Sequence, residues 1–220
     1  MEAYHNPVLL KQSVDALEIK EAGVYVDITF GGGGHSCEIL SRLGPSGKLY
    51  AFDQDPDAER NRIDDERFVL IQENFRYLSR FLRFYGVQKV DGILGDLGVS
   101  SHQFNVAERG FSTRFDADLD MRMNKKDAVS AYNVVNTYSE TQLSDVLFQY
   151  GELRNARAMA AKIATARVEE KISTSFRLKE VLRSFLPAAK EHKILAQIFQ
   201  AIRIEVNQEL EVLKEFLLQV

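Results

Sequence analysis

Short apolar blocks alternate with segments of helical spacing over the first hundred residues. The apolar blocks are rich in β-branched and aromatic residues, which predicts four strands at residues 24–28, 49–53, 67–71 and 90–95. Helices are predicted between them at residues 36–43, from Asp55-Pro56 onward and at 78–85, with a short amphipathic helix at 7–19 before the first strand. This alternation is typical of an α/β fold with a parallel, right-handed, doubly wound sheet.

The pattern changes after residue 104. Residues 105–123 have no period and predict a long loop, which in a compact domain is usually functional. Helical patterns follow, including a capping box from Ser139 to Gln142, and the apolar residues between Ile198 and Leu217 predict one long amphipathic helix that packs back on the sheet. The predicted organisation is a sheet domain at 1–104, an inserted all-helical domain at 105–193 and a returning helix at 194–220.

Four glycines, Gly31 to Gly34, follow the first predicted strand. Such glycines allow positive φ and close approach of a ligand to backbone N–H groups at the start of a helix. A dinucleotide fingerprint requires a third glycine where Ser36 or Cys37 stands, so a nicotinamide-dependent oxidoreductase is the less favoured alternative. An acid followed by G-x-G, here Asp27-x-x-x-Gly31-x-Gly33, is typical of methyltransferases that use S-adenosylmethionine (AdoMet).

Candidate ligand-binding residues also follow the other predicted strands. Asp53 ends the second strand, where a ribose diol needs a carboxylate acceptor. Phe75 follows the third strand and is expected to stack on a purine ring, although an isolated phenylalanine is more often a core residue. Asp96 follows the fourth strand, beside the reacting end of the cofactor. Because ligands of parallel sheets bind at the carboxyl ends of the strands, these side chains are expected to share one crevice.

Composition limits the class of protein. With 220 residues and 45% hydrophobic content, the chain is long enough to bury a core. The single cysteine, Cys37, excludes an internal disulfide framework and leaves no zinc cluster, so we expect no metal and a reducing cytoplasm. No signal peptide and no apolar run of about 20 residues is present, which predicts a soluble protein without a membrane span.

Charge is unevenly distributed along the chain. The net charge is −4, yet residues 151–193 hold ten basic against five acidic residues, a net +5, and the remainder holds 18 basic against 27 acidic residues, a net −9. This asymmetry indicates that the helical insertion faces a polyanion; a mixed, solvated helix surface is the alternative.

Seven sequence blocks resemble the RsmH (MraW) family of AdoMet-dependent methyltransferases, which methylate the exocyclic N4 of a cytidine in the decoding region of bacterial 16S ribosomal RNA. The blocks are His5-x-Pro7-Val8-Leu9-Leu10, Asp27-x-Thr29-Phe30-Gly31-x-Gly33-Gly34-His35-Ser36, Asp53-x-Asp55-Pro56, Asp96-Leu97-Gly98-Val99-Ser100-Ser101-x-Gln103, Glu108-Arg109-Gly110-Phe111, Leu119-Asp120-Met121-Arg122-Met123 and Phe199-Gln200-Ala201-x-Arg203-Ile204-x-Val206-Asn207. The resemblance implies a Rossmann-like class I methyltransferase fold and a small-ribosomal-subunit partner. It also implies AdoMet contacts from Gly33, Gly34, His35, Asp53, Phe75, Asp96 and Gln103.

The chain departs from this family in a few places. Relatives commonly have glycine and arginine where this chain has Ile28 and Gly32, and an aliphatic residue where it has Gly95. None of these differences removes a proposed AdoMet contact. Family members continue into further strands with a Phe-His-Ser-Leu-Glu-Asp-Arg block, which predicts that this chain is truncated. A four-stranded sheet would then leave the edge of its fourth strand unpaired, and two copies of the chain are expected to pair there as a homodimer. The second alternative function, beside the oxidoreductase, is that of a ribosome-binding relative without catalytic activity.

The resemblance also implies the chemistry. The amino nitrogen of cytosine is a poor nucleophile, so acceptors must polarise its N–H groups, and we assign this role to Asp96 with Ser100 and Ser101. No covalent nucleophile is needed, and no Asp/Asn-Pro-Pro-Tyr block of DNA amino-methyltransferases occurs. The base must leave its stack, and the loop with Arg109 and Arg122 is expected to support the RNA.

Overall fold

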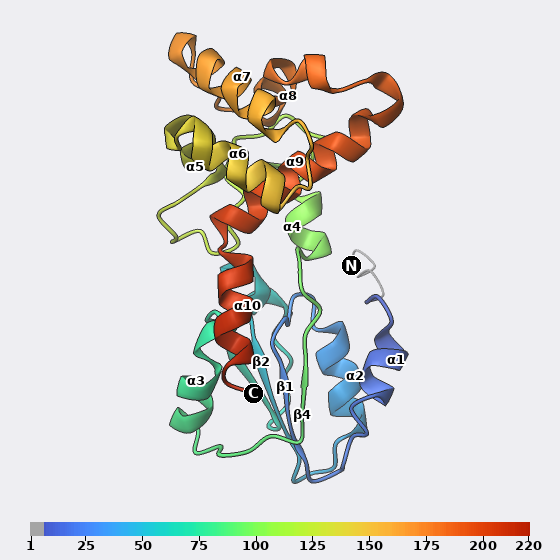
Figure 1. Ribbon diagram of the computed structural model, residues 1–220. Helices are drawn as coiled ribbons and strands as arrows, with labels where there is room; N and C mark the ends of the chain where they lie inside the picture. The colour runs from blue at the N-terminus through green and yellow to red at the C-terminus, as the bar shows by residue number, and fades with distance from the viewer. Residues whose placement is uncertain (1–6) are drawn as a thin grey trace. The chain divides into compact units, whose positions relative to one another are not determined.

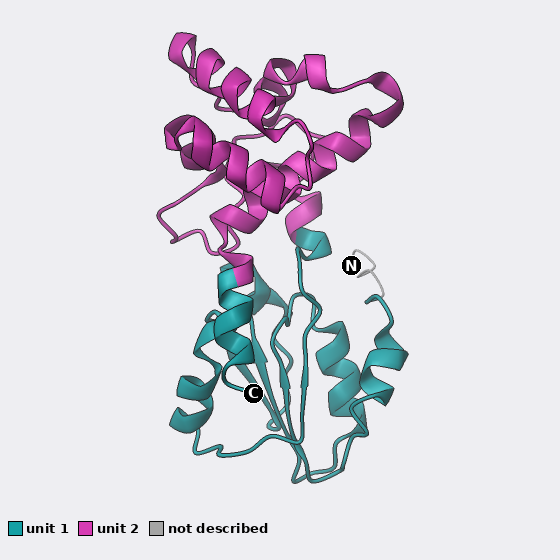
Figure 2. Ribbon diagram, viewed as in Figure 1, with its two compact units in different colours: residues 1–102, 211–220 teal, residues 103–210 magenta. Residues whose placement is uncertain are grey.

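The computed structural model describes residues 7–220 and divides into two compact units. The first unit comprises the residues up to 102 together with 211–220, and the second comprises 103–210 (Figure 2). The second unit therefore interrupts the first in the sequence. Within residues 7–220, all four strands belong to the first unit, and helices occur in both units.

A four-stranded parallel sheet forms the centre of the first unit. Its strands are β1 (Val24–Asp27), β2 (Lys48–Phe52), β3 (Phe68–Ile71) and β4 (Gly92–Leu94), in the order β3-β2-β1-β4. All three pairings are parallel, which confirms the predicted topology. The order reverses direction at β1, so the carboxyl end of this central strand lies at the topological switch point, where open α/β sheets bind ligands.

Helices cover both faces of the sheet (Figure 1). One face packs against α1 (Leu10–Asp15) and α2 (Gly34–Arg42), and the other packs against α3 (Leu78–Phe84) and α10 (Glu209–Leu217). Two 3-10 turns, Pro56–Asn61 and Phe75–Tyr77, follow β2 and β3. Alternate strand residues enter opposite cores: Leu49 and Ala51 face α2, whereas Tyr50 and Phe52 face α3. This is the period of two expected for a doubly covered strand.

The second unit is mainly helical. It contains α5 (Ala131–Thr137), α6 (Glu140–Gln149), α7 (Ala156–Glu169), α8 (Ser175–Val181) and α9 (Glu191–Val206), and α4 (Ser101–Asn105) leads into it. The capping box of Ser139 and Gln142 is present at the start of α6, as predicted. The predicted loop 105–123 carries a 3-10 turn, Ala107–Arg109, and an isolated bridge from Asp118 to Thr174. Within residues 7–220, no helix has the length and apolar character that crossing a bilayer requires.

The C-terminal segment corrects the predicted domain limits. The single long helix is wrong, because the chain breaks between α9 and α10 at Gln208, whose φ is 50°. The preceding residue, Asn207, uses its side-chain amide to accept a hydrogen bond from the Met123 N–H at 2.7 Å. The apolar face of α9 packs on α5 and α6 instead of the sheet, so the insertion is 103–210 rather than 105–193, and only 211–220 return.

Phe216 tests how much α10 contributes to the first unit. Its side chain is 8% exposed and its ring lies edge-on to Phe75, with centroids 5.5 Å apart. Phe216→Ala is expected to lower the free energy of unfolding by about 3–5 kcal/mol, because it leaves a cavity against the sheet. Urea denaturation measures this change. The control Leu218→Ala, at a position 87% exposed, should stay within about 0.5 kcal/mol, and equal effects of the two variants would contradict the assignment.

Candidate functional site

The glycine turn after β1 has the predicted conformation. Gly31 and Gly33 have φ of 50° and 78°, in the left-handed region that favours glycine. A Cβ on Gly33 would lie 3.0 Å from the Phe30 ring, and one on Gly34 would overlap the Pro7 ring. Helix α2 begins at Gly34, two residues earlier than predicted. The turn therefore presents the first turn of α2, with its unpaired backbone donors, at the carboxyl edge of the sheet.

Asp53 joins the ends of β1 and β2. One carboxylate oxygen, Oδ2, accepts the Gly31 N–H at 2.8 Å, and Oδ1 accepts the Asp55 N–H at 2.8 Å. Burial raises the pKa of Asp53 to about 6, despite these two bonds that favour the ionised form. Each ionised oxygen keeps a lone pair. The carboxylate can therefore accept two further hydrogen bonds, as from a pair of hydroxyls.

A chain of hydrogen bonds connects β1 to the turn after β4. Asp27, fully buried at the end of β1, accepts the Ser36 hydroxyl at 2.7 Å and the Thr29 N–H at 3.0 Å. Burial raises the pKa of its carboxyl group. The Thr29 hydroxyl oxygen accepts the Asp96 N–H at 2.7 Å. Thr29 thus fixes the backbone of Asp96, and the Asp96 residue is exposed. The sequence included Thr29 only in a block shared with the family and did not predict this role.

The remaining candidates of the first unit lie at the same edge. His35, in the first turn of α2, is buried and its Nε2 has no hydrogen-bond partner among the described residues. A buried nitrogen without a partner is unfavourable, so a ligand acceptor or donor would stabilise it. Phe75 opens the 3-10 turn after β3 and is half-buried against Phe216. The Cβ of Ser100 lies 3.7 Å from where a Gly31 Cβ would stand, and Ser101 begins α4 and is exposed.

One side chain that the sequence did not indicate adds to this site, and one predicted contact lies in the second unit. The Asn61 side-chain amide donates to the Gly31 carbonyl at 2.9 Å, so both backbone groups of Gly31 are fixed by side chains. No sequence signal pointed to Asn61. Gln103 lies on α4 within the second unit and is buried. Its expected role as a cofactor contact stays a prediction.

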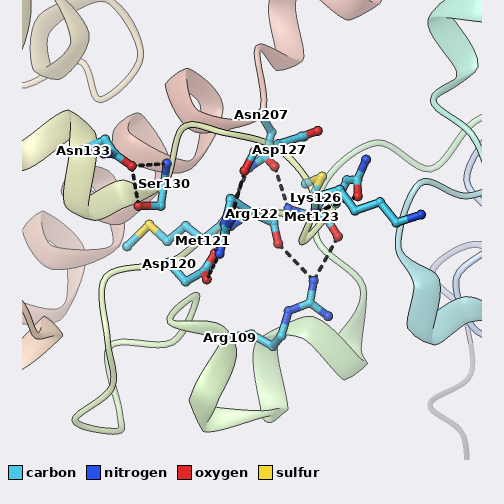
Figure 3. Close-up of polar contacts among 11 residues, drawn as sticks. Arg109, Asp120, Met121, Arg122, Met123, Lys126, Asp127, Ser130, Asn133 and Asn207 are labelled. Atoms are coloured by element: carbon cyan, nitrogen blue, oxygen red, sulfur yellow. Dashed lines mark hydrogen bonds and ion pairs between the residues drawn. The ribbon is translucent and has the colours of Figure 1, made fainter.

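Arg109 and Arg122 make internal contacts in the structure, and their expected role in RNA binding stays a prediction. Arg109 is 5% exposed, and its Nη2 donates to the carbonyls of Arg122 and Met123, each at 3.0 Å (Figure 3). Arg122 forms a bidentate pair with Asp120 at 2.8 and 2.7 Å and donates to the Asp127 carbonyl at 2.9 Å. Both guanidinium groups therefore stabilise the segment around Met123, because they donate hydrogen bonds to its backbone carbonyls.

The basic residues of the insertion are divided between two roles. Arg167 bonds to the carbonyls of Val135 and Tyr138, and Arg177 and Lys179 form ion pairs with glutamates. The other basic residues between 151 and 193 are exposed and form no ion pair within the described chain: Arg154, Arg157, Lys162, Lys171, Arg183, Lys190 and Lys193. Most of the predicted positive charge is therefore available to solvent or to an anionic partner.

Comparison with known proteins gives matches over nearly the whole chain. The MraW methylase family matches residues 2–220. A relative from Christiangramia forsetii, named Ribosomal RNA small subunit methyltransferase H, is 67% identical over 216 residues, which cover 98% of this chain and 72% of that protein. Relatives with the same name from Flavobacterium johnsoniae and Bacteroides fragilis are 65% and 57% identical over 98% of this chain, and it covers 72% and 71% of their lengths.

The Asp53 carboxyl group should titrate well above an ordinary aspartate. Burial raises its pKa to about 6, whereas the Arg67 side chain beside Asp65 lowers the pKa of that carboxyl to about 2. Carbon-13 NMR of labelled aspartates across pH 2 to 8 is expected to show the Asp53 midpoint near 6, with Asp65 as the internal control. Asp53→Asn assigns the resonance, and a midpoint near 4 would contradict the predicted burial effect.

Thr29→Val tests the bond that fixes Asp96. Valine keeps the side-chain volume but has no oxygen to accept the Asp96 N–H, so this amide is expected to exchange with deuterium several-fold faster, on the order of the 1 kcal/mol of a typical hydrogen bond. Hydrogen-exchange mass spectrometry over residues 95–98 measures it. Thr29→Ser keeps the hydroxyl and should exchange at the original rate; identical exchange in all three proteins would exclude the proposed tether.

Proposed function

Because the chain belongs to the MraW methylase family, we propose that it transfers a methyl group from AdoMet to the N4 amine of a cytidine in the decoding region of 16S rRNA. The observation that carries this proposal is the bonded carboxyl edge of the sheet, where Asp53 holds Gly31 and Thr29 holds Asp96. This edge combines the Asp53 carboxylate, which is proposed to bind the cofactor, with the exposed carboxylate of Asp96. The relatives named as small-subunit rRNA methyltransferases support 16S rRNA as the substrate.

The residues at this edge fit AdoMet. Asp53 would accept the two ribose hydroxyls, since each carboxylate oxygen has one free lone pair. The left-handed turn at Gly31 and Gly33 lets a ligand approach the backbone, and the unpartnered Nε2 of His35 gives it a polar contact. Phe75 would pack on the adenine. The remaining proposed contacts are Gly34, Asp96 and Gln103. When bound, AdoMet supplies an electrophilic methyl group on a sulfonium sulfur.

Asp96 is proposed to activate the substrate amine. Its carboxylate would accept a hydrogen bond from the N4 amine, draw the nitrogen lone pair out of conjugation and hold the proton that the nitrogen loses. The tether to Thr29 fixes its backbone, so little orientation entropy is lost when the base binds. The Ser100 and Ser101 hydroxyls are proposed to assist. Cys37, exposed on α2, has no role because methylation at nitrogen needs no attacking thiolate.

Two other functions are tested against this proposal. A non-catalytic rRNA-binding relative would bind small subunits without turnover. A nicotinamide-dependent oxidoreductase would bind NAD and not AdoMet.

We also propose that the protein acts on the small ribosomal subunit in the cytoplasm. Pairing of two copies through the open edge of β4 would be detected by its effect on molecular mass in solution.

Asp96→Asn is expected to lower kcat by about 10²- to 10⁴-fold, because the amide cannot hold the proton. Transfer of tritium from labelled AdoMet to 16S rRNA in small subunits measures kcat, and calorimetric titration measures AdoMet and NAD binding separately. Asp64→Asn removes an exposed carboxylate of the same unit and serves as the matched control. AdoMet affinity is expected to change only a few-fold in either variant.

Each outcome discriminates between the functions. Binding of AdoMet with transfer to 16S rRNA supports the proposal. Full turnover by Asp96→Asn would remove Asp96 from the mechanism and leave the reaction in place. Binding without transfer would favour the non-catalytic relative, and binding of NAD alone would overturn the methyltransferase function.

A further inference from the structure

Arg114 lies against two exposed aromatic rings of the second unit. Its guanidinium carbon is 5.1 Å from the ring centroid of Phe104 and 5.4 Å from that of Phe115, within the range of cation–π contacts. The two phenylalanines are 40% and 39% exposed, and Arg114 is exposed as well. The cluster joins α4, which carries Phe104, to the segment that precedes Asp118.

Arg114 is held in place without losing its charge. Its Nη2 donates to the Asn105 side-chain oxygen at 3.0 Å, and its Nε donates to the Ser112 hydroxyl at 3.3 Å. Neither partner is an acid, and Arg114 forms no ion pair with any residue from 7 to 220. Nearby Asp116 instead accepts the Phe176 N–H at 3.2 Å. The guanidinium group is therefore ordered, positive and accessible.

Phe115 is also anchored through its backbone. Its carbonyl accepts the Ser175 hydroxyl at 2.8 Å, and the Ser175 N–H donates to the Ala117 carbonyl at 2.9 Å. These bonds attach the Phe115 segment to the start of α8. Phe176, the next residue of α8, is a further exposed aromatic side chain beside this attachment. An exposed ring whose backbone is fixed loses little entropy when a flat ligand stacks on it.

The other cation–π contacts of the described chain lack this combination. Arg109 and Phe111 are both buried, and Arg76, which contacts the Tyr77 ring, is neutralised by Glu215. Only the Arg114 contacts among residues 7–220 combine exposed rings with an arginine that has no acidic partner. The cluster thus has the properties of a base-stacking site: partly exposed aromatic rings next to an arginine without an acidic partner.

We propose that Phe104, Arg114 and Phe115 form a stacking platform for an unpaired nucleobase of the RNA substrate, with Arg114 also contacting the adjoining phosphate. This inference rests on the proposed function, since it names the surface of the second unit that holds the rRNA. A single-stranded segment fits better than a duplex, because bases of A-form RNA are stacked on each other and do not offer their faces. A positively charged platform excludes a basic partner.

The test combines two measurements on the full chain. The double variant Phe104→Ala/Phe115→Ala should weaken binding of a fluorescent single-stranded oligoribonucleotide by about 5- to 150-fold, from the 1–3 kcal/mol of a stacked base. In methyl transfer to small subunits, KM should rise by a similar factor while kcat and AdoMet affinity stay within about threefold. Arg114→Gln should weaken RNA binding and reduce its dependence on salt.

Controls separate stacking from folding and from the proposed function. Phe148→Ala, on α6 at a position 64% exposed and without a cation–π contact to any described arginine, should leave RNA affinity and KM unchanged. Phe104→Leu/Phe115→Leu keeps the apolar volume, so it should fold normally and still lose affinity. Wild-type affinity in both double variants would overturn the platform. Absence of transfer by the wild-type chain would overturn the proposed function alone, because oligoribonucleotide binding still tests the platform.

Discussion

The first unit depends on one buried carboxylate at the end of its central strand. Asp27 has no solvent exposure, and the raised pKa of its carboxyl group reflects the free energy lost when an ion leaves water. Donors from Ser36 and Thr29 offset that loss. Because Ser36 lies in the first turn of α2 and Thr29 bonds to Asp96, the same carboxylate fixes both the glycine turn and the turn after β4.

Asp53 forms the second connection of this edge, between β1 and β2. The two aspartates differ in exposure: Asp27 is enclosed and can bond only within the chain, whereas Asp53 is half-buried and keeps acceptor capacity for a ligand. Burial raises the pKa of Asp53 to about 6, so it is ionised at neutral pH and becomes protonated as the pH falls through that value. Asp27 therefore supports the glycine turn, and Asp53 can recognise a diol.

Hydrogen bonds within the second unit hold its irregular segment from Met121 to Met123 in place. The side chains of Arg109 and Asn207 bond to backbone groups of the segment from Met121 to Met123. The hydrogen bond from Asn207 to the Met121 carbonyl joins residues that are 86 positions apart in the sequence. Buried backbone groups outside helices and sheets need such partners. Arg109 and Arg122, which the sequence predicts as RNA contacts, both donate hydrogen bonds to backbone carbonyls in or near this segment. Arg114, which has no such internal acceptor on the backbone of the segment, remains exposed.

The sequence by itself determined the strands, the parallel type of the sheet and the glycine turn, because apolar β-branched blocks, their alternation with helical segments and glycine runs can be read along the chain. It also indicated Asp53 and Asp96, since a residue that ends a parallel strand must lie at the carboxyl edge. Only the tertiary structure decided that Thr29 holds Asp96, that Asn207 and Gln208 end α9, and that Arg109 is internal. Each of these depends on a hydrogen-bond partner distant in sequence, and the periodicity of a chain carries no record of such partners.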